Sequence, residues 1–180
     1  ILSFASQADW EAWLLGPGQS CTGLWLRLAK KTAREQAPSS FSYAEALEGA
    51  LCHGWIDGQR KSHDEEAFLQ RFTPRTARSI WSEINKAKAE TLIAAGRMSE
   101  AGLREVERAR ADGRWAKAYA PASKATVPPD LQRALNANRA AKAFFATLNS
   151  QNRYAVLFRI QNVKKAETRA RKIAQFVEML

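Results

Sequence analysis

Hydrophobic and polar residues alternate in a short segment near the start of the chain. Leu24, Leu26 and Leu28 are each separated by one other residue, which is the period of a strand with one buried face. The segments 55–61 and 67–73 have a similar pattern, and the polar stretch SHDEE separates them. We therefore predict a β-hairpin, and a sheet of about three antiparallel strands in all.

Elsewhere the apolar residues recur every three or four positions, as on one face of a helix. Ser42 and Glu45 have the spacing of a capping box, and Gly54 follows where that helix should end. Further helices are predicted over 7–15, 79–95, 99–113, 129–148, 151–161 and 164–179. Strands and helices are segregated along the chain, so we predict an α+β fold with an all-helical C-terminal half.

A stretch rich in proline and alanine, residues 114–128, interrupts the helical pattern. We interpret it as a linker between an α+β domain, 1–113, and a basic helical subdomain, 129–180. The domain 1–113 then holds the three-stranded sheet and the helices that follow it.

Charge is distributed unevenly along the 180 residues, whose formal net charge is +10. Residues 1–96 hold 11 basic and 11 acidic residues, whereas residues 97–180 hold 17 basic and 7 acidic ones. Such asymmetry is typical of proteins with an acidic partner, such as nucleic acid, anionic lipid or an acidic protein. The other interpretation is a set of solvated, arginine-rich helix faces.

One face of the predicted sheet collects aromatic and ionic side chains. If Ile56, Phe68 and Phe72 point into the core, alternation turns their neighbours to the other side. We interpret that side as a ligand-binding face, with the residues Trp25, Arg27, Trp55, Asp57, Gln59, Arg71 and Thr73. The alternative is a surface ion pair of Asp57 with Arg71 or Arg27, which contributes little.

A second candidate site follows the hairpin, in the sequence RFTPRTARS. Ser79 can cap the helix predicted from residue 79, and a helix N-terminus attracts anions. Arg75 and Arg78 flank it, and arginine forms paired hydrogen bonds with phosphate or carboxylate. We predict an anion-binding site at Arg75, Arg78 and Ser79, and the alternative is that these arginines pair with nearby carboxylates.

The last predicted helix is amphipathic with a cationic face. Its candidate nucleic-acid-binding residues are Lys164, Lys165, Arg169, Arg171 and Lys172, with Arg169 and Lys172 expected side by side on the open face. No aromatic residue lies among them and no nucleic-acid-binding motif is present. The alternative is that the apolar stripe of this helix packs on its own core.

No motif for catalysis, metal binding or a cofactor is found in the sequence. Cys52 and His53 are adjacent, and neighbouring helical residues point about 100° apart, so they do not form a dyad. No metal-ligand spacing or phosphate-binding glycine loop occurs. Cys21 and Cys52 are predicted to be free thiols, with one disulfide as the alternative. We predict no catalytic residue, metal or cofactor, and an enzyme with Asp57 as acid or base stays an alternative.

The N-terminal residues ILSFASQADWEAW include no basic leader, and no apolar run reaches the roughly 20 residues of a membrane span. The sequence therefore predicts a cytoplasmic protein without a transmembrane segment. Because the chain starts without Met, a removed leader stays open.

Three blocks of sequence resemble a known family. SYAEALEGALCHGWIDGQRK, RFTPRTARSIWSEINKAKAETLIAAGRM and VKKAETRARKIAQFVEML are similar to the YdeI/OmpD-associated family, also called bacteriocin-protection, over nearly the whole chain. The resemblance implies resistance to bacteriocins or cationic antimicrobial peptides, association with an outer-membrane porin, and a periplasmic location. It carries no established enzymatic activity and no catalytic residues.

These patterns together favour a non-enzymatic binding or stress-resistance protein. Its partner is expected to be a small anionic ligand or a protein, bound at the sheet face and the nearby helix start. Nucleic-acid binding through the basic C-terminal half and an enzyme that uses Asp57 are the alternatives.

Overall fold

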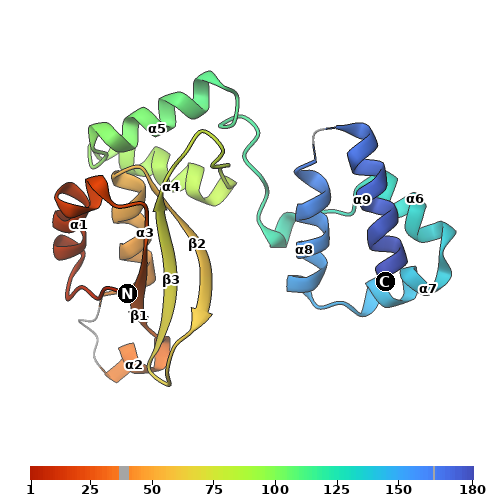
Figure 1. Cartoon of the computed structure of the whole chain (residues 1–180), viewed down its shortest axis with the longest axis horizontal. Coiled ribbons are helices and arrows are strands. Elements are labelled where there is room, and N and C mark those ends of the chain that lie inside the picture. The colour runs from red at the N-terminus through yellow and green to blue at the C-terminus, as the bar shows by residue number, and fades with distance from the viewer. Residues whose placement is uncertain (37–40, 164) are drawn as a thin grey trace. The chain divides into compact units, whose positions relative to one another are not determined.

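The computed structural model describes residues 1–36, 41–163 and 165–180. They form two compact units, Ile1–Tyr119 and Ala120–Leu180, each with its own hydrophobic core (Figure 1). The sheet belongs to the first unit, and the described residues of the second form helices and loops. The predicted α+β class is therefore confirmed.

The sheet contains three strands, β1 (Leu24–Ala29), β2 (Trp55–Ser62) and β3 (Ala67–Pro74). They are antiparallel in the order β1–β3–β2, so the predicted hairpin of β2 and β3 lies beside β1. Leu24, Leu26 and Leu28 are buried on one face, as their alternation predicted.

Helices of the first unit cover this inner face of the sheet. The unit contains α1 (Gln7–Leu15), η1 (Pro17–Ser20), α2 (Lys31–Gln36), α3 (Tyr43–Cys52), α4 (Glu83–Ala94) and α5 (Glu100–Ala111). Trp10 of α1 and Ala46 of α3 belong to one core cluster with Leu26 and Phe72 of the sheet. The Trp10 indole Nε1 donates to the Ala46 carbonyl at 3.0 Å, so its burial leaves no orphaned donor.

A second cluster joins α3 to α4 and α5. It includes Leu51, Trp81, Val106 and Trp115, and the rings of Trp81 and Trp115 are 4.8 Å apart. Gly102 lets α5 approach the end of α3, because a Cβ at this position would lie 2.2 Å from the Cys52 carbonyl oxygen.

Caps explain most helix starts in this unit. Ser42 and Glu45 form the predicted capping box of α3, and Gly54 follows its end with a φ of 75°. The predicted start of the next helix at residue 79 is wrong: α4 begins at Glu83, and Ser82 accepts a hydrogen bond from the Asn85 N–H.

The second unit is a bundle of short helices. It contains η2 (Ala122–Lys124), α6 (Pro129–Ala137), α7 (Arg139–Thr147), α8 (Ser150–Gln161) and α9 (Ala166–Met179). The single helix predicted over 129–148 is two helices, because Asn138 takes an extended conformation and caps α7 by accepting from the Ala141 N–H. Leu131, Ile160 and Phe176 belong to the core. No helix among the described residues of either unit is long and apolar enough to cross a membrane.

Candidate functional site

The register of the three strands decides which side chains share a face. Trp25 pairs with Arg71, and Ile56 pairs with Thr73, so these four residues lie opposite the buried core. Lys61 pairs with Leu69 on the same side. We call this the outer sheet face and define it by Trp25, Arg27, Ile56, Lys61, Arg71 and Thr73.

Trp55 and Asp57 do not lie on the outer sheet face, so their predicted orientation is wrong. Trp55 pairs with Pro74, Asp57 pairs with Phe72, and the Trp55 side chain is buried in the core cluster. A β-bulge between Asp57 and Arg60 shifts the register, so alternation changes phase within β2.

Gln70 and Gln59 show how the bulge is built. The buried Gln70 side chain donates to the carbonyl oxygens of Gly58 at 2.9 Å and of Gln59 at 3.2 Å. These carbonyls sit at the shift in the ladder, so Gln70 satisfies them. Gln59, a predicted ligand-binding residue, lies in the bulge and is exposed.

The outer sheet face has a cationic and aromatic centre. The Lys61 Nζ lies 4.4 Å from the centroid of the Trp25 ring, and the Arg71 guanidinium carbon lies 5.9 Å from it. Arg27 is different, because its guanidinium forms an ion pair with Asp64 at 3.2 Å. Within the described chain Lys61 and Arg71 have no ion pair with a carboxylate, so both charges stay available to an anionic partner.

Asp57 is a hydrogen-bonded residue at the inner side of the sheet. Its carboxylate accepts from the Tyr43 hydroxyl at 2.8 Å and from the Asn85 amide at 3.4 Å. Burial and the Asp57 charge raise the pKa of Tyr43, which stays protonated as a donor. Asp57 lines none of the four best-formed cavities of the described residues.

The three residues of the predicted anion site do not come together at a helix start. Ser79 belongs to a turn, where its hydroxyl accepts from the Thr76 N–H. Arg78 is exposed, whereas Arg75 is 5% exposed and stacks 3.4 Å above the Trp81 ring. Arg75 is therefore the buried residue of the three, and no local sequence pattern predicts its contact with Trp81.

The predicted basic face of the last helix is only partly free. Arg169 Nε and Nη2 donate to the two carboxylate oxygens of Asp130 at 2.6 and 3.1 Å, and its Nη1 donates to the Ile160 carbonyl. Arg169 therefore fastens α9 to α6 and does not lie beside Lys172 on an open face. Lys165 and Arg171 are exposed and Lys172 is half-buried, whereas Lys164 lies outside the described residues.

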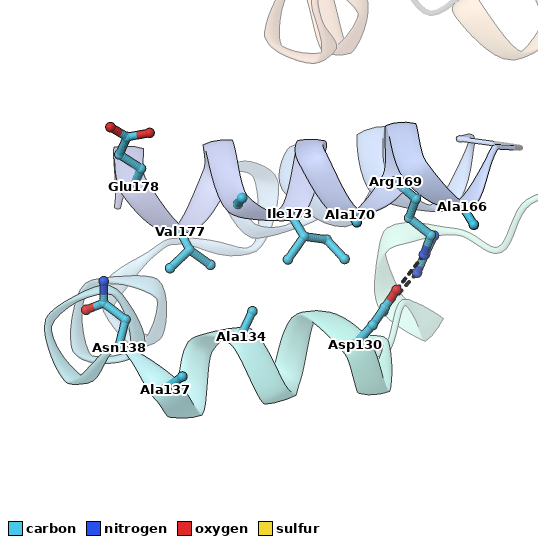
Figure 2. Close-up of a pocket in the computed structure, with 11 residues that line it drawn as sticks. Asp130, Ala134, Ala137, Asn138, Ala166, Arg169, Ala170, Ile173, Val177 and Glu178 are labelled. Carbon is cyan, nitrogen blue, oxygen red and sulfur yellow. Dashed lines mark hydrogen bonds and ion pairs between the residues drawn. The ribbon is translucent and has the colours of Figure 1, made fainter.

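A groove of about 720 Å³ lies between α6 and α9. Figure 2 shows the residues that line it. Its walls are formed mainly by alanines and by Ile173 and Val177, and the pair of Asp130 and Arg169 stands at one end. The groove is therefore shaped for apolar groups rather than for an anion.

Burial keeps the thiol of Cys52 protonated. Cys21 and Cys52 are both free, and burial raises the pKa of the Cys52 thiol to about 11. Burial also lowers the pKa of His53. No group of three or more metal-binding side chains is found among the described residues.

Comparison with protein-family models gives two matches. Residues 2–105, more than half of the chain, match the model described as Domain of unknown function (DUF8412). The chain belongs to the DUF8412 family. Residues 124–180 match a second model, described as Bacteriocin-protection, YdeI or OmpD-Associated.

The second match confirms the resemblance predicted from the sequence, over the C-terminal unit. The motifs GWIDGQ and RFTPR, on which the resemblance partly rested, lie instead in the DUF8412 region. The sheet, the bulge and Arg75 thus belong to the DUF8412 part, and the α6–α9 groove belongs to the bacteriocin-protection part. Searches of curated proteins and of solved structures found no significant match.

Proposed function

We propose that this protein is a non-enzymatic binding protein that contributes to resistance against bacteriocins or cationic antimicrobial peptides. The description of the family matched by residues 124–180 supports the biological role. The outer sheet face supports the mode of action, which is binding to an anionic partner.

The observation that carries the proposal is the arrangement of Lys61 and Arg71 around Trp25. Both cations lie within the range of a cation–π interaction with the aromatic ring, which favours side-chain conformations that place the two charges beside it. Neither has an ion pair with a carboxylate of the described chain, so an anionic group meets two charges that no carboxylate neutralises. Such a group gains charge-assisted hydrogen bonds without first displacing a carboxylate.

The net charge indicates whether the protein binds the cationic peptides or the anionic groups that these peptides seek. A protein of charge +10 repels cationic peptides but binds the anionic groups that those peptides seek. We infer that it occupies anionic headgroups of the envelope and so competes with the peptides. This mode of action requires a periplasmic location, which cell fractionation tests directly.

Vesicle binding tests the anionic partner. We expect the full chain to sediment with vesicles that contain an anionic phospholipid and not with purely zwitterionic ones. Binding should weaken strongly between low and physiological salt, because the contacts are exposed ion pairs. Lys61→Gln with Arg71→Gln should abolish most of the binding.

The matched control is Arg78→Gln with Lys117→Gln, which removes the same charge from two exposed residues away from the sheet. If both double variants lose the same fraction of binding, net charge alone explains the result and the outer sheet face is not the site. Cells that produce each variant are then compared for survival in a cationic peptide.

Nucleic-acid binding through the second unit is the other candidate. Residues 120–180 hold 11 basic and 3 acidic residues, so this unit carries most of the net charge. If it binds nucleic acid, Lys165→Gln with Arg171→Gln and Lys172→Gln should abolish gel retardation of RNA and DNA, and wild-type affinity should fall steeply with salt. Retardation that is absent at low salt removes this candidate.

A further inference from the structure

The groove between α6 and α9 leaves an apolar surface of the second unit uncovered. Ile173 and Val177 point from α9 toward α6, and alanines of both helices line most of the rest (Figure 2). Among these alanines, Ala170 and Ala174 of α9 and Ala137 of α6 are exposed. An open apolar groove of about 720 Å³ between two helices is typical of a surface that another helix covers.

The polar groups of the groove lie at its two ends. At one end Arg169 and Asp130 neutralise each other through two hydrogen bonds, of 2.6 and 3.1 Å. At the other end stand Asn138 and Glu178, and the Glu178 side chain points away from α6 (Figure 2). Between the ends the lining side chains are apolar, so the groove accepts the apolar face of a helix.

The exposed apolar residues of α9 have the spacing of a helix-pairing surface. Ala170, Ala174 and Val177 follow one another at intervals of four and three residues, as do the contact positions of a coiled coil. We call these three residues the α9 seam. Because two of them are alanines, a second helix can approach the α9 seam closely.

Two residues of opposite charge flank the α9 seam. Arg171 follows Ala170 and Glu178 follows Val177, so both hold the same position beside the seam, on the side away from Ile173. Both are exposed, and within the described chain neither forms an ion pair. In coiled coils, charges that flank the contact positions determine the partner and its direction.

The order of these charges favours an antiparallel partner of the same sequence. In a parallel pair the two-fold axis runs along the seam and puts the flanking charges of the two copies on opposite sides. In an antiparallel pair the axis crosses the seam, and these charges lie on the same side. With the axis beside Ala174, Arg171 of each copy lies opposite Glu178 of the other. Such self-complementarity is what a two-fold symmetric interface requires.

The backbone favours the same direction. Helices α6 and α9 run the same way along the groove, from Asp130 and Ala166 at one end to Asn138 and Glu178 at the other (Figure 2). A helix that lies antiparallel to both brings its positive N-terminal end to their negative C-terminal ends. The dipoles and the flanking charges therefore agree.

We propose that the α6–α9 groove is a dimer interface, in which α9 of a second copy of this chain lies antiparallel on the α9 seam. The two seams supply most of the affinity, and the ion pairs of Arg171 with Glu178 fix direction and register, because exposed ion pairs contribute little energy. The overlap of two short helices predicts a weak dimer. The interface belongs to the second unit, so this proposal and the one on the outer sheet face can fail independently.

Sedimentation equilibrium of the full chain at increasing concentration tests the proposal. We expect the molar mass to rise from 20.1 kDa, the mass of one chain, toward twice that value. Ala174→Glu puts a charge at the centre of the seam and should keep the chain monomeric. Ala143→Glu, on the exposed side of α7, is the matched control and should dimerise like the wild type. Both alanines are exposed, so neither substitution disturbs a core.

Exchanging the flanking charges tests the direction of the pair. Arg171→Glu alone, or Glu178→Arg alone, brings like charges together twice and should raise the dimer Kd by about tenfold. The double variant restores both ion pairs with the charges exchanged, so its Kd should return close to that of the wild type. Its net charge equals that of the wild type, which separates pairing from overall charge.

Three results would overturn the proposal. A chain that stays monomeric at every concentration leaves the groove to a helix of another protein. A dimer that Ala174→Glu does not weaken uses a different surface. If the double charge variant dimerises no better than the single variants, α9 does not pair antiparallel in this register.

Discussion

At the scale of single residues, the role of Asp57 follows from the side chains that bind it. An aspartate two residues after a tryptophan, with a glycine on either side of this short stretch, suggests chemistry, but Tyr43 and Asn85 bind it from two different helices. Its carboxylate ties α3 and α4 to the first strand of the hairpin. A structural role explains why the side chain is half-buried and well supplied with donors.

Tyr43→Phe tests this role. The variant keeps the ring but leaves Asp57 without its shorter hydrogen bond, so we expect a loss of about 1–3 kcal/mol in the free energy of unfolding. Denaturant unfolding measures it. The control is the double variant with Asp57→Asn, which should lose less than the sum of the two single changes because they share one bond. Strict additivity would contradict the contact.

At the scale of elements, the hydroxyl group of one serine determines where α4 begins. Ser79 and Ser82 both precede α4, but only Ser82 accepts from an N–H of the first turn. We expect Ser82→Ala to cost about 1 kcal/mol of stability, as for other N-caps, and Ser79→Ala to cost less. Thermal unfolding of the two variants compares them, and equal losses would favour a helix that starts earlier.

Because α5 lies close to α3, we predict that a Gly→Ala substitution at Gly102 changes stability in the opposite direction to the one that helix propensity predicts. Gly→Ala inside a helix normally stabilises by about 1 kcal/mol. At Gly102 the new Cβ would lie 2.2 Å from the Cys52 carbonyl oxygen, so the helices must separate and we expect Gly102→Ala to destabilise strongly. Urea unfolding shows whether the free energy of unfolding of the variant rises or falls. A stabilised variant would contradict the prediction and show that α5 shifts freely.

The predictions from sequence succeeded where the signal is local. The alternation of β1 and the capping box of α3 are read from neighbouring residues, and both are present. The faces of β2 were wrong because the bulge depends on Gln70, a residue of another strand. The predicted cationic face of α9 is only partly free because Arg169 binds Asp130, 39 positions earlier in the chain. Contacts between residues so far apart in the chain produce no periodic pattern in the sequence.

At the scale of the whole molecule, stability is divided between two units with separate cores. Each core is small, so single contacts between helices matter more than in one large domain. The ion pair of Asp130 and Arg169 is such a contact in the second unit. Hydrogen bonds from Arg169 hold the pKa of Asp130 below its usual value.

This lowered pKa predicts acid sensitivity of one unit. A carboxyl whose pKa is lower in the folded state contributes stability above its unfolded pKa, about 4, and loses it as pH falls through the folded value. The protection of amide hydrogens in residues 120–180, measured as the ratio of the intrinsic to the observed exchange rate, should therefore fall below about pH 4, and Asp130→Asn should remove that pH dependence. Exchange in residues 1–119 should not respond to the substitution, and a response there would show that the units unfold together.

The bulge in β2 also constrains how many residues this strand can contain. Trp55 and Asp57 face inward before it, and Lys61 faces outward after it, so one extra residue separates two registers. Deleting Gly58 would keep either the buried tryptophan or the outward lysine in place, but not both. Related sequences that keep both features must also keep the residue count between them, even where the identities of residues 58 and 59 change.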